Sequence, residues 1–311
     1  MKNVLVVGGA GYIGGYVVDL LSSNNSLYVT CYDNLLYEFQ YLKKIPFIFG
    51  DVRNYSKLSE ILRHFDVVIW LAAIVGDVAC NVNKTLTREI NIDSVKWLVE
   101  NYHGKIIYAS TCSVYGKNDG LLDENSPVNP LSYYAETKLI AENYVLKHPD
   151  SLVFRLGTLF GQGDNYSRVR FDLVTNVFSM RAARGEPLMV IGGEQWRPVI
   201  HVKDVGEAII HGLDSNLSGL YVLHNSNHTL MEIATLVKQH SGARIIASDI
   251  HPEDLRNYRV NSIKFRNTGW SPSYSLQYGI IEIMNLVQSQ RIKYVDDNIY
   301  SNAKYMKEQY G

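Results

Sequence analysis

A glycine-rich turn near the start of the chain constrains the fold more than any other feature. Four apolar residues, Val4–Val7, run directly into GGAGYIG at residues 8–14, and helical spacing follows over Tyr12–Ser22. Glycine permits a tight turn and a close approach of the backbone to a bound group, and the free N–H groups at a helix start attract an anion. A strand, a glycine turn and a helix in this order predict a phosphate-binding βα unit.

A carboxylate after the second apolar run supports the same interpretation. Asp33 follows Leu27–Tyr32 and lies 19 residues beyond Gly14. At this spacing a carboxylate accepts hydrogen bonds from the ribose hydroxyls of a dinucleotide, whereas a 2′-phosphate would be repelled. The sequence therefore predicts NAD rather than NADP as the cofactor. Asp51 is a candidate adenine contact, and a helix cap or turn residue is an equally good interpretation of it.

Short apolar runs alternate with helical patterns through the first half of the chain. The runs are apolar on both faces, as buried strands of a parallel sheet are. The predicted strands are Val4–Val7, Leu27–Tyr32, Phe47–Phe49, Val67–Leu71, Ile106–Ala109 and Leu152–Leu156, and the predicted helices are Tyr12–Ser22, Tyr55–His64, Thr85–Tyr102 and Tyr133–Leu146. This alternation predicts an α/β fold with a Rossmann-type, doubly wound parallel sheet.

The pattern loosens after Gly161, where we expect a smaller, interleaved α/β lobe. The elements predicted there are helices at Arg170–Arg184, Val205–Leu213, Met231–Ser241 and Leu276–Val287, and strands at Leu188–Ile191, Val199–Val202 and Leu220–Leu223. We expect a cofactor domain over residues 1–165, to which residues 199–225 return, and a substrate lobe from residues 166–198 and 226–290. The tail, residues 291–311, is polar and rich in tyrosine, and the sequence assigns it no role.

Charge and cysteine content exclude several classes of protein. The 311 residues carry a net charge of −1, so no basic excess exists to bind nucleic acid or an anionic membrane. No run of 18 apolar residues predicts a membrane span. The 3 cysteines contain no CxxC pair, which favours a reducing cytoplasm without disulfides or a metal site.

A tyrosine and a lysine four residues apart suggest proton transfer. With 22 tyrosines in the chain a chance Y-x-x-x-K match is expected, and two occur, Tyr134/Lys138 and Tyr300/Lys304. Only the first lies in a predicted helix, between two sheet strands and behind Ser132, a good N-cap. We expect Lys138 to lie beside the phenol and lower its pKa, so that Tyr134 can take a proton from a sugar hydroxyl.

Small polar residues follow the strand Ile106–Ala109. The carboxyl ends of such strands face the ligand crevice, so Thr111 can share a hydrogen bond with the substrate and with Tyr134. The neighbouring Cys112 is more often an inert, buried thiol than a reactive one.

Taken together, these motifs resemble the extended short-chain dehydrogenase/reductases, the NAD-dependent epimerase/dehydratase family that acts on nucleotide sugars. The resemblance rests on GGAGYIGG (8–15), Asp33, Gly50-Asp51, LAA (71–73), STCSVYG (110–116), YAETK (134–138) and RPVIHVKDV (197–205). It implies a bound NAD, a C-terminal lobe that binds the nucleotide sugar, and a homodimer formed through the helices Thr85–Tyr102 and Tyr133–Leu146.

Matching these motifs residue by residue implies specific roles. Thr111, Tyr134 and Lys138 correspond to the catalytic residues of the family. The implied cofactor contacts are Gly8, Gly11, Tyr12, Ile13, Gly14, Asp33, Asn34, Asp51, Val52, Leu71, Ala72, Ala73, Asn91, Tyr134 and Lys138. The implied substrate contacts are Thr111, Ser113, Thr158, Asn176, Arg197 and Arg256, of which the two arginines suit a pyrophosphate.

Departures from the family pattern bear on the reaction. The 4,6-dehydratases have an Asp-Glu pair where this chain has Cys112 and Ser113, and Thr158 replaces an asparagine that binds the sugar nucleotide. Segments 71–80, 168–182 and 254–261 resemble a bacterial subgroup that includes enzymes oxidising C4 of GDP-linked heptoses, whereas segment 110–116 is more like 4-epimerases. We therefore expect oxidation of a nucleotide sugar at C4, by a 4-epimerase or a 4-dehydrogenase. The alternatives are a 4-keto-sugar reductase, a 4,6-dehydratase and a non-catalytic dinucleotide-binding protein.

Overall fold

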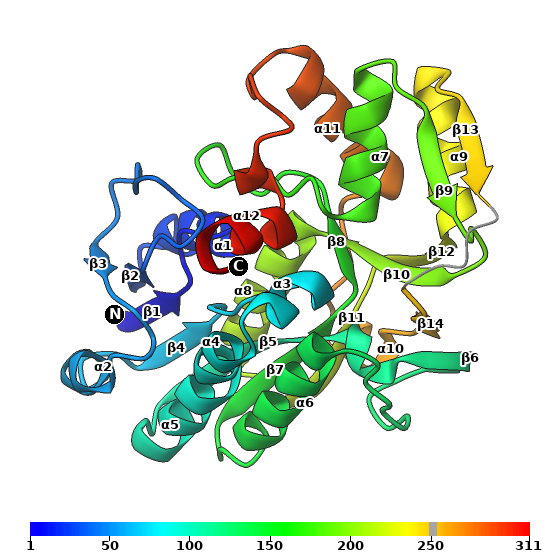
Figure 1. Ribbon diagram of the computed structural model, residues 1–311. Helices are drawn as coiled ribbons and strands as arrows, with labels where there is room; N and C mark the ends of the chain where they lie inside the picture. Colours follow the sequence, from blue (N-terminus) through cyan, green and yellow to red (C-terminus); the bar gives the residue numbers. More distant parts are fainter. Residues whose placement is uncertain (249–253) are drawn as a thin grey trace.

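A parallel sheet forms the centre of the molecule. The computed structural model describes residues 1–248 and 254–311. The sheet contains β1 (Lys2–Val7), β2 (Leu27–Asp33), β3 (Phe47–Phe49), β4 (Val67–Trp70), β5 (Lys105–Thr111), β7 (Ser151–Leu156) and β11 (Gly219–Leu223). Its seven strands follow the order β11-β7-β5-β4-β1-β2-β3, so the direction of winding reverses between β1 and β4 (Figure 1). The predicted Rossmann-type α/β fold is confirmed.

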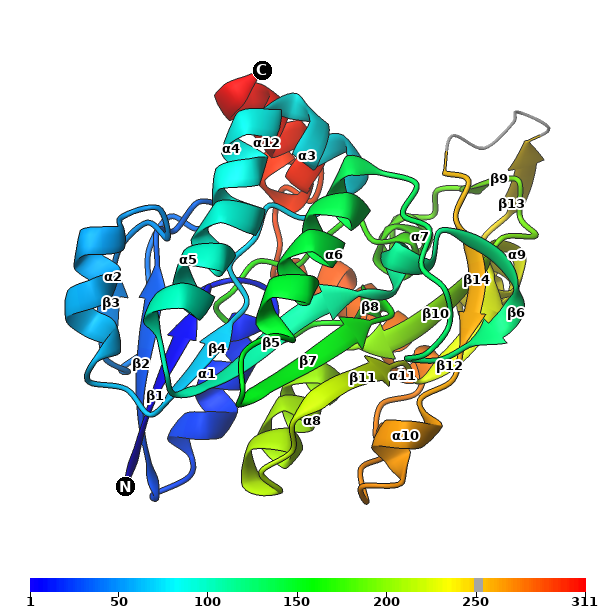
Figure 2. The same ribbon diagram turned by 90° about the horizontal axis from the view of Figure 1, so that it is seen from below.

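Helices cover both faces of this sheet because its strands are apolar on both sides. Along β1, Val4 and Val6 pack in a cluster with α1 (Gly14–Ser22) and α8 (Val202–Asp214). Leu5 and Val7 pack on the opposite face. The helices there are α2 (Tyr55–Leu62), α5 (Ser94–Asn101) and α6 (Tyr133–Val145), and Figure 2 shows the sheet between the two helical layers. The sheet is therefore buried on both faces, as its composition predicts.

One predicted helix contains an irregular turn. The range Thr85–Tyr102 corresponds to α4 (Lys84–Arg88), a π-helical turn η1 (Glu89–Asp93), and α5. Such turns are frequent at functional sites, and this one contains the buried Asn91.

In the described part of the chain, the second lobe consists of short strands and four helices, most of which come from the second half of the chain. One sheet has the order β12-β10-β8, and β13 pairs with β9 and β14 with β6. The strands are β6 (Lys117–Leu122), β8 (Thr158–Phe160), β9 (Leu188–Ile191), β10 (Trp196–His201), β12 (Ser226–Thr229), β13 (Ile245–Ser248) and β14 (Asn257–Val260). The helices are α7 (Val174–Ala183), α9 (Leu230–Ser241), α10 (Ile263–Arg266) and α11 (Leu276–Gln288). Strand β11 belongs to the seven-stranded sheet, and α8 packs on a face of that sheet. The chain therefore crosses between the two lobes more than once.

Several boundaries differ from prediction. Helix α1 starts at Gly14 rather than Tyr12, and α7 starts at Val174 rather than Arg170, since residues 168–173 are irregular and contain a turn. The strand predicted at Val199–Val202 ends at His201, whose side chain accepts a hydrogen bond from the backbone N–H of Lys203 and caps α8.

The polar tail contains a helix that the sequence analysis missed. After the 3-10 turn η3 (Asn298–Tyr300), α12 (Asn302–Tyr310) lies against α3 (Asp77–Val82) in both ribbon views. Met306 is fully buried among the apolar residues on the α5–α6 face of the sheet. No described helix is long and apolar enough to cross a membrane.

Candidate active site

A cavity of about 990 Å³ lies at the carboxyl ends of the central strands, between the sheet and the second lobe. Ligands of doubly wound sheets bind at this edge, where the strand order reverses. Most of the residues predicted for the site line this cavity, namely Gly8, Gly11, Tyr12, Ile13, Gly14, Asp33, Asn34, Val52, Leu71, Ala72, Ala73, Thr111, Ser113, Tyr134, Lys138, Thr158, Arg197 and Arg256.

The glycine turn allows a close approach between β1 and the segment after β4. Gly8 has a φ of +83°, and a Cβ atom on it would lie 2.6 Å from the backbone N of Ala72. A Cβ atom on Gly14 would collide with the carbonyl oxygen of Gly8. Only glycine fits both positions, and the bare backbone of Gly11 lies at the cavity wall.

Asp33 lies next to this turn with its carboxylate held by the backbone. One carboxylate oxygen accepts from the N–H of Ala10 at 3.0 Å and the other from the N–H of Leu35 at 2.8 Å. Burial raises the pKa of the Asp33 carboxyl, and these hydrogen bonds oppose the rise. A glycine wall for a pyrophosphate and a fixed acceptor for ribose hydroxyls fit NAD.

Tyr134 and Thr111 both line the cavity. Tyr134 lies in the first turn of α6, behind Ser132, whose hydroxyl accepts from the N–H of Ala135 and caps the helix. Thr111, at the end of β5, lies close enough to the Tyr134 phenol for its side chain to favour the phenolate. A substrate hydroxyl that enters this pair can therefore exchange a proton with it.

Lys138 follows one turn later on α6 and is 4% exposed. Its ammonium nitrogen lies 4.1 Å from the centre of the Tyr108 ring. Burial lowers the pKa of Lys138 to about 7. Burial also raises the pKa of Tyr134 well above its ordinary value, although the Thr111 hydrogen bond opposes this. The expected lowering of the tyrosine pKa is therefore wrong for the protein without its cofactor, because desolvation disfavours the phenolate.

Asn91 lies behind the cavity wall. Its amide accepts from the N–H of Ile74 at 2.8 Å, donates to the carbonyl of Ile74 at 2.9 Å, and contacts the hydroxyl of Thr137 at 3.2 Å. Thr137 in turn donates to the carbonyl of Tyr134 at 2.8 Å. The π-helical turn thus braces the segment after β4 against the helix that carries Tyr134.

A buried ion pair supports the strand end from the other side. Arg155 and Glu142 are paired at 2.6 Å, and Glu142 also accepts from the hydroxyl of Ser110 at 2.6 Å. The thiol of Cys112 is fully buried and donates to the carbonyl of Arg155 at 3.3 Å. The sequence analysis missed this pair, because its members are brought together by packing of α6 against β7.

Two arginines predicted to bind a pyrophosphate share one carboxylate. Asp254 lies 2.8 Å from the guanidinium of Arg197 and 2.7 Å from that of Arg256. Arg256 also donates to the hydroxyl of Ser113 at 2.9 Å and lies 3.3 Å from Asp77. The two guanidinium groups hold the pKa of Asp254 well below its usual range despite its burial. Asp254 and Ser113 therefore hold the guanidinium groups of Arg197 and Arg256 in place near the end of β5, where Thr111 lies.

The remaining predicted contacts have partners of their own. Asp51 is paired with Arg53 at 2.8 Å. Asn176 is fully buried, where it accepts from the N–H of Gly161 at 2.9 Å and donates to the carbonyl of Arg170 at 3.0 Å.

Further cavity residues were not singled out from the sequence. They are Tyr37, Glu38, Arg168, Arg170, Asp172, Asn302 and Ala303. The charged residues at alternate positions, Arg168, Arg170 and Asp172, were the feature of the sequence that could have indicated this part of the cavity. The charge of Arg170 reaches Tyr134 and favours its phenolate.

The fold and the cavity define the class of protein, an extended short-chain dehydrogenase/reductase with a Rossmann sheet and a Tyr/Lys/Thr site. The chain belongs to the NAD dependent epimerase/dehydratase family, whose model matches residues 4–222. NAD is the cofactor, as the glycine turn and Asp33 predict.

Relatives cover nearly the whole chain. A Methanocaldococcus jannaschii protein named "Putative UDP-glucose 4-epimerase" is 27% identical over 303 residues, which are 92% of this chain and 98% of that protein. UDP-glucuronic acid decarboxylase 1 of Danio rerio is 26% identical over 90% of this chain and 71% of its own length. The crystal structure of Thermus thermophilus UDP-glucose 4-epimerase with NAD has a TM-score of 0.79 at 26% identity, and the match covers 93% of this chain and 99% of that one.

Proposed function

We propose that the protein oxidises the C4 hydroxyl of a nucleotide-diphosphate sugar, as a 4-epimerase or a 4-dehydrogenase. The observation that carries this proposal is the position of Tyr134 and Thr111 in the wall of one cavity that Arg197 and Arg256 also line. The two arginines suit a pyrophosphate, and the hydroxyl pair suits the sugar beyond it. The relatives described above bear names of UDP-sugar enzymes, which supports a nucleotide sugar as the substrate.

The residues divide the chemistry between them. Thr111 and Tyr134 bind the C4 hydroxyl, and Tyr134 takes its proton as the C4–H bond breaks and a 4-keto sugar forms. NAD, when bound between the glycine turn and Asp33, supplies the acceptor for the hydride and a positive charge that favours the phenolate. Lys138 gains its proton most readily when a negative charge forms at the phenol, because both groups are buried. If the 4-keto sugar stayed in the cavity and were reduced on its other face, the product would be the 4-epimer; if the cavity released it, the protein would act as a 4-dehydrogenase.

The structure of the strand end argues against dehydration. A 4,6-dehydratase needs an acid next to the catalytic threonine, and this chain has the fully buried Cys112 thiol there, hydrogen-bonded to a carbonyl. A 4-keto-sugar reductase that uses NADP is disfavoured by Asp33, whose carboxylate would repel a 2′-phosphate. A non-catalytic role is disfavoured because Tyr134 and Lys138 are both retained and both face the cavity.

The test is the substitution Tyr134→Phe, which removes one oxygen from a fully packed ring. We expect it to keep NAD bound and to lower the reduction of NAD by nucleotide sugars at least a hundredfold, measured by NADH absorbance. Tyr144→Phe, on the same helix, is the matched control and should keep full activity. Reduction of NAD by Tyr134→Phe at the wild-type rate would exclude Tyr134 as the catalytic residue. NMR of the sugar products of the wild type distinguishes an epimer from a ketone.

A further inference from the structure

The C-terminal segment forms part of the cavity wall. Asn302, at the start of α12, lines the cavity together with Ala303 and is only 2% exposed. Its side-chain amide donates to the carbonyl of Val75 at 2.8 Å, and its backbone N–H donates to Asp172 at 2.9 Å. Its amide oxygen accepts from the guanidinium of Arg168. Asn302 therefore connects the segment after β4 with the wall at residues 168–172.

Apolar and aromatic contacts fix α12 in this position. Met306 is fully buried, and the ring of Tyr305 lies 5.3 Å from the ring of Tyr37. The guanidinium of Arg168 also packs over the Tyr37 ring, 4.2 Å from its centre. Arg168 also donates to the carbonyl of Ile299 at 2.8 Å. A helix of 9 residues is not stable alone in water, so α12 depends on these few contacts.

Two partners of the C-terminal segment, Tyr37 and Val75, belong to the cofactor half of the cavity. Tyr37 follows Asp33 after β2, and Val75 follows the predicted cofactor contacts Leu71–Ala73. The arginines proposed for the substrate, Arg197 and Arg256, are instead held by Asp254 and, within the described residues, have no hydrogen bond to the segment. The segment thus borders the place where a dinucleotide fits.

We propose that η3 and α12 form a strap that closes the NAD site, with Asn302 as its attachment point, so that NAD enters and leaves only when the strap detaches. The charges agree with this arrangement. The half-buried guanidinium of Arg168 donates to two neutral oxygens of the strap, at Ile299 and Asn302, so a negatively charged dinucleotide in the same cavity stabilises it there. Cofactor binding and attachment of the strap then reinforce each other. The proposal depends on NAD as the cofactor and holds for any sugar substrate.

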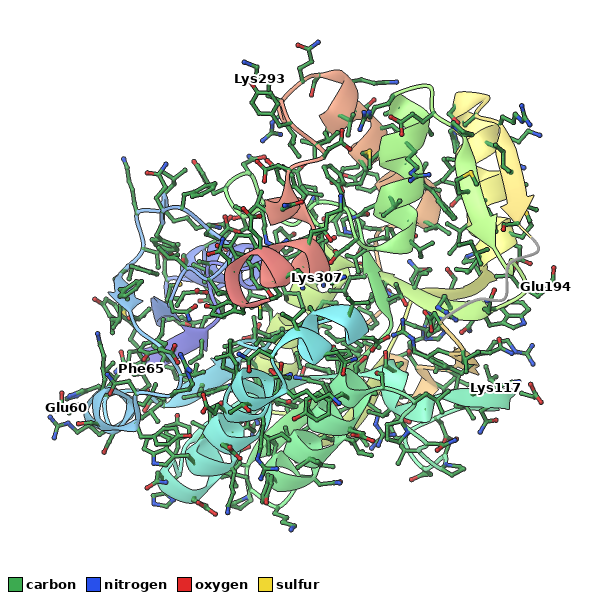
Figure 3. All side chains as sticks on the ribbon, in the orientation of Figure 1. Glu60, Phe65, Lys117, Glu194, Lys293 and Lys307 are labelled. Carbon is green, nitrogen blue, oxygen red and sulfur yellow. The ribbon has the colours of Figure 1, made fainter. Side chains whose placement is uncertain are left out.

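The experiment measures cofactor exchange rather than turnover. Purified holoprotein is mixed with excess isotope-labelled NAD, and the bound cofactor is identified by mass spectrometry at intervals after rapid desalting. Asn302→Ala removes two buried side-chain hydrogen bonds and should speed exchange by about ten- to a hundredfold. Removal of residues 298–311 should speed it further. Lys307→Ala, at an exposed position of α12 that Figure 3 labels, is the matched control and should exchange like the wild type.

A second measurement separates a strap from an ordinary contact. Because a strap blocks entry as well as exit, NAD association with the apoprotein should also be faster in Asn302→Ala, whereas a lost contact would raise only the dissociation rate. Exchange at the wild-type rate in Asn302→Ala, or an unchanged association rate, overturns the proposal. If the truncated protein does not fold, Asn302→Ala and Tyr305→Ala decide the question. Tyr134→Phe provides a separate test of the sugar chemistry, so failure of one proposal is distinguishable from failure of the other.

Discussion

Replacing Lys138 by methionine should stabilise the apoprotein while removing its activity. The lysine side chain is buried, and its pKa is about 7 in the folded chain against an ordinary value of 10.5. The unfolded chain therefore binds more protons than the folded chain between these two pH values, and stability increases as pH rises through this window. The destabilisation of the folded chain by the buried Lys138 is therefore greatest below pH 7 and disappears above pH 10.5.

The size of the effect follows from the two pKa values. A tenfold change in acidity corresponds to about 1.4 kcal/mol, so the buried lysine costs about 4 kcal/mol at pH 7.5 and about 1.5 kcal/mol at pH 9.5. Lys138→Met has a similar shape without the charge. We expect its free energy of unfolding to exceed that of the wild type by these amounts, so that the gap narrows with rising pH.

Urea unfolding of the apoprotein, followed by tryptophan fluorescence at the two pH values, measures this gap. Lys117→Met is the control, since Lys117 is exposed on β6 (Figure 3) and lies outside the cavity. Its stability difference from the wild type should be the same at both pH values. A gap between wild type and Lys138→Met that does not change with pH would refute the reasoning.

Three further substitutions test other parts of the site. Glu142→Gln leaves Arg155 buried without its counter-charge, and should lower the free energy of unfolding by about 3–5 kcal/mol in urea titrations. Gly8→Ala forces a Cβ atom to within 2.6 Å of the backbone of Ala72, and the purified protein should contain no NAD when its released nucleotides are measured; a full complement of NAD would contradict the role of the turn. Asp254→Asn removes the carboxylate shared by two guanidinium groups, and should tighten nucleoside diphosphate binding roughly tenfold in calorimetry at low salt. Weaker binding would show that Asp254 instead positions the arginines.

The Rossmann half of the fold was predictable because its signals are local. Each central strand is a short apolar run, and the glycine turn marks the first βα unit. Context also selected, of two Y-x-x-x-K matches, the one whose tyrosine and lysine both line the cavity. Tyr134 and Lys138 share α6, whereas Tyr300 lies in η3 and Lys304 in α12, so the second match is not a pair on one helix.

The missed features depend on contacts between distant segments. The helix α12 is polar and has one fully buried apolar residue, Met306, so its sequence contains no periodic pattern. The pairing of Asp254 with Arg197, and of Glu142 with Arg155, appears only when segments that are distant in the sequence pack together. The pKa of Tyr134 is raised because the phenol is desolvated, and the spacing of Tyr134 and Lys138 in the sequence does not reveal this burial.

The position of β11 in the sheet has a consequence for biosynthesis. This strand, Gly219–Leu223, is the edge strand next to β7, yet more than sixty residues, which include β8, α7, β9 and β10 of the second lobe, lie between it and the end of β7 at Leu156. While the ribosome is making those residues, the edge of β7 has unpaired backbone groups, and an open edge of this kind promotes association between nascent chains. The ribosome must therefore synthesise the chain as far as Leu223 before β11 can pair with β7 and cover this edge of the seven-stranded sheet. The two lobes consequently fold together rather than one after the other.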